Sequence, residues 1–526
     1  MKIKLIIFIP LITALILIAQ NDIIMWSKTF DGICHQEDVA YDVELTSDGG
    51  YVVAGVKWDQ APFSPDWIFP HMWILKLDIN GDTLWTTTYY HNIEISDPLY
   101  NDYYLKYAGA YDIEQTSDGG YVLCGYADVE YPDSATNYIE SMCIVKLDES
   151  GNVSWNKIYL EGYNNVAKTI KQTADGGYIV AGTVKLKNDS NKYDIYAKMM
   201  KINSIGDTLW TQKYQESDAF PLTGIKATNL YKIDINIQNE IFGVGTMYNG
   251  VSSNGWIIKI DENGNTLWSK DFGDIEGESF YDLDITKDDN LILVGNQYVR
   301  DLNAVGVWLN KISFDGDKLW TKNINSGVYG NSCYGNSIKQ TMDDGFIIGG
   351  EISINSPEMW IVKTNDTGDT LWTKKYGTNT QDYASSIEQT LDNGYIVCGQ
   401  TEGSYASDNS SDWTDMWVLK LDHDGNYTGI ENDEGLLIDD YKLCQNFPNP
   451  FNNQTNIEYA IENISEVEIT VYNSNGQLIQ NLVNEKQGKG QYSIQYKADN
   501  LNSGVYYYRL KINGITKETK KMLYLK

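Results

Sequence analysis

The chain has 526 residues, which is enough for more than one domain. Its formal net charge of −32 excludes the basic footprint that nucleic-acid binding requires, and favours a soluble surface whose like charges repel one another. With only four histidines, the sequence contains no histidine cluster for a metal, and it also lacks a nucleophile elbow or a phosphate-binding loop.

Residues 1–20 have the pattern of a signal peptide. Lys2 and Lys4 precede an apolar run from Leu5 to Ile18, and Ala19-Gln20 follows it. A membrane anchor is the alternative, but the run is short for a span and a strand-like segment begins at once. No cysteine ends the run, which argues against a lipoprotein. We therefore expect a cleaved, exported protein with no transmembrane segment in its mature form.

One pattern recurs seven times between residues 39 and 422. Each copy has a polar turn, an apolar segment ending in glycine, and a segment resembling W-I-x-K-L-D. These short, β-branched and aromatic segments, bounded by Gly, Asn and Asp, predict four antiparallel strands per copy. The glycines are Gly55, Gly125, Gly182, Gly245, Gly295, Gly350 and Gly399, and six copies continue to a tryptophan at Trp85, Trp155, Trp210, Trp268, Trp320 or Trp372.

The count of tryptophan strands predicts how the repeats close. The seventh copy ends after Asp422, where Gly429 stands at the tryptophan position. Residues 23–32 contain a tryptophan strand, around Trp26, with no preceding copy. We therefore expect an all-β fold in which residues 21–425 form a seven-bladed β-propeller closed by the N-terminal strand. Closure removes the open sheet edges that invite aggregation.

The cysteines have two interpretations. Six cysteines in an exported chain normally suggest disulfides. However, Cys124 and Cys398 occupy the repeat position of Ala54 and Ala181, which predicts buried free thiols. A bridge between Cys124 and Cys143, on neighbouring strands of the second copy, is left open.

The candidate binding residues lie outside the repeat positions. Trp58, Trp67 and Trp413 are expected in loops between second and third strands, and these loops are longest in copies one, two and seven. Closure makes those copies neighbours, so we hypothesise one binding face for a glycan, peptide or protein. The alternative is that the aromatic side chains only pack the loops onto the ring. The proposed ligand-binding residues are Trp58, Trp67, Tyr103, Tyr131, Tyr138 and Trp413, interleaved with Asp59, Asp66, Asp128, Asp133 and Asp412.

Other chemistries fit less well, and we expect no catalytic residue, cofactor or metal site. The turn containing Asp78 and Asp82 offers oxygen ligands for calcium, but too few for so short a hairpin. The same turn is similar to the Gly-x-x-x-Trp repeat of pyrroloquinoline-quinone enzymes, yet its Asp is one residue closer and no adjacent cysteine pair is present. A secreted glycosidase or lyase, using paired carboxylates of the acidic loops on a polysaccharide, is the alternative function.

An acidic linker is expected at residues 426–444, and the composition changes at Gln445. The last 82 residues hold nine Lys and Arg against seven Asp and Glu. About seven short strands, such as "EVEITVYN" and "GVYYYRLKI", predict a small β-sandwich over residues 445–526.

Three blocks carry a resemblance: "NFPNPFNNQTNIEYAI", "VEITVYNSNGQLIQNLV" and "LNSGVYYYRLKINGITKETKKMLYLK". They resemble the type A C-terminal sorting domain of the type IX secretion system. The resemblance implies an Ig-like sandwich that directs a folded cargo through the periplasm to the outer-membrane translocon, and that is commonly cleaved off. The cargo is then secreted or attached to the cell surface. The alternative is an accessory β-domain without a sorting role. The signature positions match Asn449, Pro450, Gly476, Gly504 and Tyr506.

Overall fold

The structure is a computed structural model. It describes residues 25–30, 37–61, 64–89, 105–130, 138–188, 192–215, 227–248, 252–273, 277–353, 356–377, 381–402, 414–427, 441–443, 446, 449–461, 465–488, 490–498 and 501–526. The expected signal peptide, at residues 1–20, lies outside this described part, as do Tyr103, Tyr131 and Trp413.

The described chain is all-β apart from one 3-10 turn, Arg300–Leu302. The first repeat forms a sheet of four antiparallel strands in sequence order. These strands are β2 (Val39–Leu45), β3 (Tyr51–Ala61), β4 (Ser64–Leu77) and β5 (Thr83–Tyr89). The expectation of four antiparallel strands per copy is therefore confirmed for this repeat, although β3 and β4 are longer than expected.

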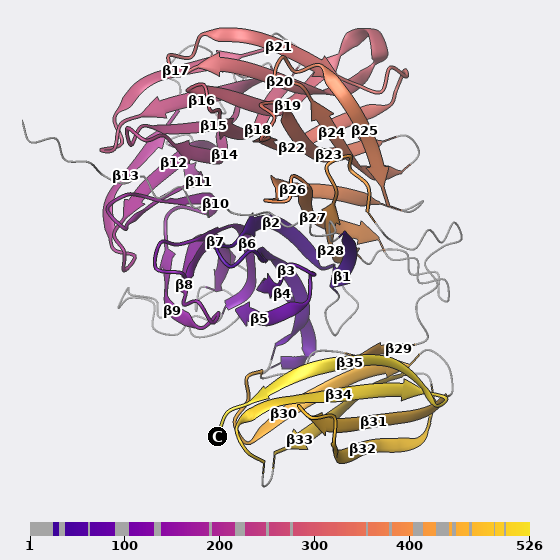
Figure 1. The fold of residues 1–526 in the computed structure, drawn as a ribbon. Coiled ribbons are helices and arrows are strands. Elements are labelled where there is room, and N and C mark those ends of the chain that lie inside the picture. Colours follow the sequence, from indigo (N-terminus) through magenta and orange to yellow (C-terminus); the bar gives the residue numbers. More distant parts are fainter. Residues whose placement is uncertain are drawn as a thin grey trace, which may run out of the picture.

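The next five repeats have the same strand order, and single parallel bridges join repeats two, three and four into one continuous sheet of 12 strands. Figure 1 shows the sheets around a common centre, with first strands such as β14, β18 and β22 innermost and fourth strands such as β17 and β21 outermost. The strands are β6 (Leu105–Gln115), β7 (Tyr121–Glu130), β8 (Tyr138–Leu147), β9 (Val153–Tyr159), β10 (Asn164–Gln172), β11 (Tyr178–Lys187), β12 (Tyr193–Ile202), β13 (Thr208–Tyr214), β14 (Ala227–Ile235), β15 (Ile241–Tyr248), β16 (Ser253–Ile260), β17 (Thr266–Phe272), β18 (Glu278–Ile285), β19 (Asn290–Val299), β20 (Ala304–Ser313), β21 (Lys318–Ile324), β22 (Ser332–Gln340), β23 (Phe346–Ser353), β24 (Pro357–Thr364) and β25 (Thr370–Tyr376).

The N-terminal strand belongs to the last repeat. The seventh repeat supplies β26 (Asp382–Gln389), β27 (Tyr395–Glu402) and β28 (Thr414–Leu421), and β1 (Trp26–Phe30) pairs antiparallel with β28. The indole N–H of Trp417 donates to the Ser27 hydroxyl at 2.9 Å. In the first sheet, the indole of Trp73 donates to a fourth-strand hydroxyl in the same way, at 2.8 Å. Hence β1 makes the contacts of a fourth strand.

The turn between the third and fourth strands explains the Gly and Trp spacing. Asp78 accepts hydrogen bonds from the backbone N–H groups of Asn80 (2.8 Å) and Asp82 (2.9 Å), so this carboxylate stabilises its own turn. Gly81 has φ +73° and lies so close to Trp26 that a Cβ would meet the indole at 2.7 Å. The same turn in the later sheets packs on the tryptophan of the preceding sheet: Gly151 on Trp85, Gly206 on Trp155, Gly264 on Trp210, Gly368 on Trp320 and Gly425 on Trp372.

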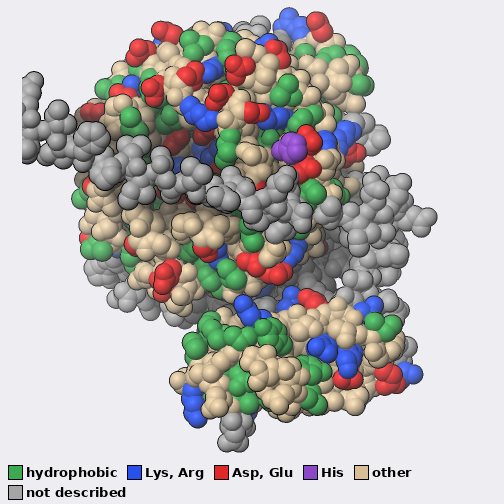
Figure 2. Space-filling model, in the orientation of Figure 1, with side chains coloured by type: hydrophobic (Ala, Val, Ile, Leu, Met, Phe, Trp, Pro, Cys, Tyr) green, Lys and Arg blue, Asp and Glu red, His purple; other side chains and the backbone are tan. Residues whose placement is uncertain are grey.

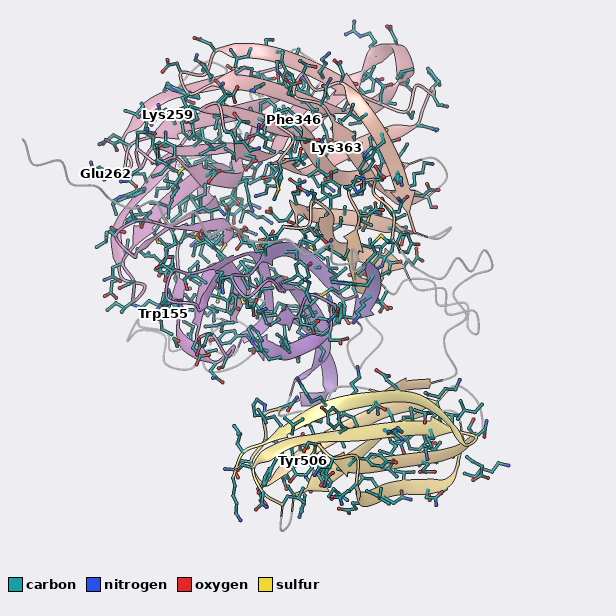
Figure 3. The ribbon with its side chains drawn as sticks, in the orientation of Figure 1. Trp155, Lys259, Glu262, Phe346, Lys363 and Tyr506 are labelled. Carbon is teal, nitrogen blue, oxygen red and sulfur yellow. The ribbon has the colours of Figure 1, made fainter. Side chains whose placement is uncertain are left out.

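These contacts recur at the outer edge of the repeat sheets. The indole of Trp155 donates to the Ser204 carbonyl at 3.0 Å, and Trp210 donates to that of Glu262 at 3.1 Å. Trp155 and Glu262 both lie at the periphery in Figure 3. The repeated tryptophan is therefore a contact between consecutive sheets.

The polar turn between the first and second strands anchors a buried lysine. Asp48 accepts hydrogen bonds from Thr46 and from the Gly50 backbone, and pairs with Lys76 at 2.9 Å. The Lys76 side chain is only 3% exposed. Burial alone would raise the pKa of Asp48, but the hydrogen bonds from Thr46 and Lys76 lower it overall. The pairs Lys146–Asp118, Lys201–Asp175, Lys259–Glu240, Lys311–Asp288, Lys363–Asp343 and Lys420–Asp392 repeat this arrangement.

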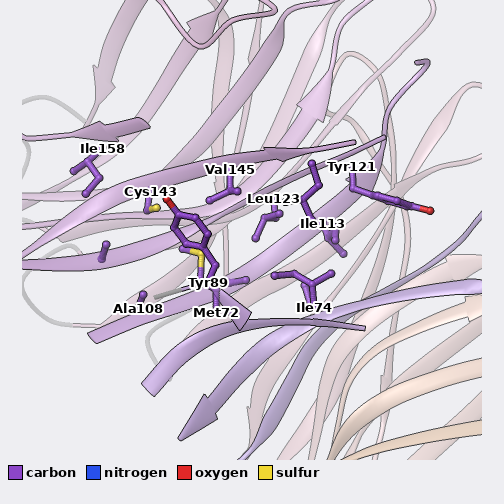
Figure 4. Close-up of a cluster of buried hydrophobic side chains, with 14 of the residues drawn as sticks. Met72, Ile74, Tyr89, Ala108, Ile113, Tyr121, Leu123, Cys143, Val145 and Ile158 are labelled. Atoms are coloured by element: carbon purple, nitrogen blue, oxygen red, sulfur yellow. The ribbon is translucent and has the colours of Figure 1, made fainter. Parts of the chain in front are cut away.

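Apolar side chains fill the space between consecutive sheets. Figure 4 shows one such cluster, in which Met72 and Ile74 from the first sheet meet Ile113 and Leu123 from the second. A comparable cluster joins the first sheet to the last and includes Trp26, Tyr51 and Val418. The middle strands are buried on both faces, which is why they are almost continuously apolar in sequence.

The pairing of β7 with β8 excludes a disulfide bridge between Cys124 and Cys143, which the sequence left open. Cys124, Cys143, Cys333 and Cys398 are buried free thiols. Cys124 is paired with Ile144, and Cys143 with Gly125, so the two cysteines are one position out of register. Successive side chains of a strand point to opposite faces. Cys124 accordingly packs in the core towards the third sheet, and Cys143 in the core towards the first.

The C-terminal part is a sandwich of two sheets around one core. Its first strand, β29 (Tyr441–Leu443), pairs with β30, so three residues of the expected linker belong to this domain. On the face shown in Figure 2, Asp and Glu are spread over the repeat sheets, whereas Lys and Arg are more frequent on the sandwich. The remaining strands are β30 (Gln454–Ile461), β31 (Ser465–Asn473), β32 (Leu478–Gln487), β33 (Gly490–Lys497), β34 (Gly504–Ile512) and β35 (Ile515–Tyr524).

The signature residues of the tail hold its ends together. Asn449, joined to Pro450 by a cis peptide bond, accepts the backbone N–H of Leu523 at 2.8 Å. Gly476 has φ +75° in the turn after β31, and Gly504 begins β34. Tyr506 is buried, and its hydroxyl donates to the Asn502 carbonyl at 2.9 Å. Figure 3 shows Tyr506 within the sandwich.

Candidate functional site

The structure changes the expected setting of Trp58 and Trp67. We expected both in a long loop, but Trp58 lies in β3 and Trp67 in β4, and only residues 62–63 separate these strands. The extra residues of the first repeat therefore extend a hairpin, in which β3 and β4 stay paired from Tyr51–Leu77 out to Ala61–Ser64. Tyr138 is the first residue of β8. Tyr103, Tyr131 and Trp413 lie outside the described residues, so their convergence with Trp58 stays a prediction.

Trp58 is held at the base of this hairpin. Its backbone N–H donates to the buried Asp38 carboxylate at 2.9 Å, and its backbone is paired with Pro70 on β4. The side chain of Trp58 is half-buried. Beside it, the amine of Lys57 lies 5.6 Å from the ring centre of Trp73.

Tyrosines that we did not single out from the sequence form a contact chain on the first two sheets. The rings of Tyr41 and Tyr111 are 4.9 Å apart, and those of Tyr111 and Tyr126 are 5.7 Å apart. Tyr41 and Tyr111 stand at the irregular position of their first strands, where the pairing register shifts by one residue. The recurring Ala-Tyr-Asp at residues 40–42 and 110–112 was the available signal.

Asp128 and Glu140 form a pair of carboxyl groups next to these tyrosines. They are directly opposed on β7 and β8. Glu140 also accepts a hydrogen bond from the Asn164 amide of β10, where the second and third sheets meet. Burial, and then the charge of Glu140, raise the pKa of Asp128 to about 7. Burial raises the pKa of Glu140 as well, although Lys168 and Asn164 oppose the shift.

Lys168 completes this group. Its amine lies over the ring of Tyr111, 3.4 Å from the centre. Burial lowers the pKa of Lys168 to about 8, opposed by the charge of Glu140. We call Tyr111, Tyr126, Asp128, Glu140 and Lys168 the seam cluster, because they lie where the second and third sheets meet.

Charged side chains also line the innermost strands, and most of them have a structural role. Asp42 accepts the backbone N–H of Ile113 on the next sheet at 3.1 Å, and Asp112 accepts that of Ile170 at 2.7 Å. The irregular register of each first strand leaves these N–H groups for the neighbouring sheet. Lys232 reaches Asp112 at 2.7 Å across the intervening third sheet.

The inner carboxyl groups outnumber the lysines, and their pKa values reflect this. Burial raises the pKa of Asp42 to about 7, that of Glu44 to about 8 and that of Asp284 to about 6. Lys232, Lys171 and Lys339, respectively, oppose these shifts. Asp112 is the exception, since burial is outweighed by Lys232 and Lys171 and its pKa falls to about 2.

Metal centres and membrane-spanning helices are both absent from the described residues. These residues contain no group of three or more His, Cys, Asp or Glu side chains arranged to hold a metal ion. None of the helical structure in this described portion is long and apolar enough to cross a membrane.

Comparison with solved structures gives distant similarities. The chain is similar to PorZ of Porphyromonas gingivalis at 11% identity, covering 93% of this chain and 74% of that one, with a TM-score of 0.32. It is similar to a protein of unknown function from Dyadobacter fermentans at 10% identity, covering 75% and 97%, with a TM-score of 0.41. The WD40 domain of Neurospora crassa Pan2 is 11% identical, with coverage of 72% and 88% and a TM-score of 0.36.

Comparison with curated proteins gave no match. Residues 445–524 match the family described as the secretion system C-terminal sorting domain, as the tail motifs led us to expect. This match indicates export to the cell surface or secretion, and engagement with the type IX machinery. The C-terminal domain of this chain is a type IX secretion sorting domain, preceded by an all-β, propeller-like repeat domain.

Proposed function

We propose that the repeat domain is a seven-bladed β-propeller closed by β1, and that it is an exported or cell-surface binding protein. The pairing of β1 with β28 and the apolar cluster shared by the first and last sheets support closure. The hydrogen bond from Ser386 of the last sheet to Asp42 of the first, 2.8 Å long, supports it as well. The sorting domain delivers this propeller to the outside of the cell.

The binding face lies on blades seven, one and two. The observation that carries this assignment is the β3–β4 hairpin, whose strands of 11 and 14 residues exceed the 8 and 8 of blade six. This hairpin carries Trp58 and Trp67, and the ring of its Phe69 lies 5.6 Å from that of Tyr107 on blade two. Aromatic rings beside carboxylates suit glycans and protein partners.

An array of glycans and candidate protein partners, probed with the purified full chain, tests the binding role. Replacing Trp58 and Trp67 by alanine should reduce retention at least tenfold while leaving the melting temperature within about 2 °C. Tyr329→Ala is the matched control, because this aromatic residue is 70% exposed on the crossover between blades five and six. Equal retention by the tryptophan variant and wild type would argue against this face.

Delivery is tested separately in cells. Deleting residues 445–526 should strand the propeller in the periplasm, since the sorting domain is removed while the signal peptide remains. The full-length variant Lys486→Ala, changed on the exposed strand β32, serves as the control and should be expressed at a similar level. Undiminished appearance of the truncated chain outside the cell would refute the sorting role.

A polysaccharide-cleaving enzyme is the second candidate. The opposed carboxyl groups of Asp128 and Glu140 favour it, because glycosidases pair a protonated carboxylic acid with an ionised carboxylate. A pKa of about 7 keeps Asp128 partly protonated near neutral pH. Release of reducing ends from a polysaccharide, lost in Asp128→Asn, would support the enzyme. Retention without products supports the binding protein.

A further inference from the structure

Two members of the seam cluster, Asp128 and Lys168, lack the hydrogen-bonded partners of buried charges such as Asp42. Asp128 Oδ1 is buried and has no hydrogen-bond partner among the described residues. Within the same described part, Lys168 makes no ion pair and no hydrogen bond, only its contact with the Tyr111 ring. By contrast, Asp42 and Asp112 both accept backbone N–H groups, and Lys76 pairs with Asp48.

This lack of partners has an energetic cost. A buried acceptor without a donor costs roughly 1–3 kcal/mol. Opposed like charges on neighbouring strands add a further penalty. Nothing in the strand pairing requires the carboxyl group of Asp128, because the same slot holds Lys185 in blade three and Tyr298 in blade five. Side chains that destabilise the fold in this way are found in native proteins where the group serves binding rather than folding.

The chemistry of the seam cluster selects the ligand. Asp128 and Glu140 accept hydrogen bonds, Lys168 donates them, and the partly exposed ring of Tyr126, next to that of Tyr111, supplies apolar surface. A saccharide has hydroxyl groups that both donate and accept, arranged around an apolar ring face. It therefore matches all three features at once.

The charges of the seam cluster disfavour both cationic and anionic ligands. A cationic ligand would meet Lys168, and an anionic ligand would meet Asp128 and Glu140, so each type of charge is opposed within the cluster. A neutral ligand avoids both repulsions.

We propose that the seam cluster between blades two and three is a binding subsite for a neutral saccharide. The hydroxyl groups of the sugar donate to Asp128 and Glu140 and accept from Lys168, while its ring packs on Tyr126. This subsite deepens the proposed binding role and rests on it. It lies on the edge of blade two that faces blade three, next to the proposed face on blades seven, one and two.

The test uses the full chain and a panel of neutral oligosaccharides built from glucose, galactose, mannose, xylose or N-acetylglucosamine. An oligogalacturonate and an oligolysine form the two charged arms. Calorimetric titration should show binding to at least one neutral member, and Asp128→Ala and Lys168→Ala should each weaken its Kd at least tenfold. The matched control is Glu351→Ala, because Glu351 is another half-buried carboxyl group whose pKa burial raises to about 7, on blade six and away from the cluster.

Folding is measured in parallel. Asp128→Ala removes an unpaired carboxyl group facing Glu140, so its melting temperature should equal or exceed that of wild type. Loss of sugar binding without loss of stability supports the subsite. Binding of only a charged arm, no binding to any neutral member, or binding unchanged in both variants would overturn it.

Failure here is distinguishable from failure of the proposed function. Retention on the wider array that depends on Trp58 and Trp67, but not on Asp128, would keep the binding protein and remove the subsite.

Discussion

Replacing Trp26 by alanine tests whether the N-terminal strand closes the ring. Trp26 is only 7% exposed, its ring packs against Tyr51 at 5.9 Å, and its indole donates to the Ile79 carbonyl at 3.1 Å. If β1 completes the last blade, this side chain joins that blade to the first. The substitution should then destabilise the whole ring.

The size of the effect follows from burial. A buried tryptophan removes roughly 150–250 Å² from water, which at about 25 cal/mol per Å² corresponds to about 4–6 kcal/mol as an upper bound. Alanine retains part of this area, and measured losses for such replacements are about 3–5 kcal/mol. Ser27→Ala should cost less, roughly 1–3 kcal/mol, because it leaves the buried Trp417 indole without its acceptor.

Urea unfolding of the full chain, followed by tryptophan fluorescence and far-UV circular dichroism, measures these losses. Trp155→Ala is the matched control, since Trp155 has the same position on an internal blade and donates to the Ser204 carbonyl. The internal site is more exposed, so its loss should be similar or smaller. A loss below about 1 kcal/mol for Trp26→Ala, beside a clear loss for Trp155→Ala, would refute closure by β1.

Two further properties of the repeat domain are predicted. Because burial raises the pKa of Glu44 to about 8 and that of Asp284 to about 6, the folded state holds these protons more tightly than the unfolded chain. The free energy of unfolding should therefore fall as pH rises from 6 to 9, by about 3 kcal/mol, and Glu44→Gln should flatten the curve; a rise over this range in urea titrations would contradict the assignment. Cys124 and Cys143 should both be alkylated by iodoacetamide in denaturant without reductant, and hardly at all in the native protein, because burial raises both thiol pKa values, that of Cys143 to about 12. A mass 2 Da below that of the free thiols would instead reveal a bridge.

Short-range patterns in the sequence were reliable because each has a local physical cause. The Asp-Gly-Gly and Asn-Gly-Asp turns were recognised from residues that favour positive φ, and the structure gives Gly49 and Gly81 φ values of +82° and +73°. The spare tryptophan strand at the N-terminus was recognised by counting, and β1 pairs with β28 as the count required. The tail was recognised from motifs that span its whole length.

Features that depend on contacts between sheets were missed or misplaced. The residues around Trp58 were expected to form a loop. The sequence does not show that β3 and β4 continue to pair beyond the length common to the repeats, because each strand is extended by its partner. The linker was expected to reach residue 444, but Tyr441–Leu443 pairs with a strand that begins at Gln454. Cys124 and Cys143 were left as a possible pair because a one-residue difference in register cannot be read from their spacing.

The sequence by itself determined the number of repeats, the strands within each, and the sorting domain at the end of the chain, because these depend on neighbours along the chain and on turn chemistry. Only the tertiary structure brought Asp128 opposite Glu140 and placed Lys168 over Tyr111. Those residues come from four separate strands, and their protonation depends on burial that exists only once the second and third sheets have packed together.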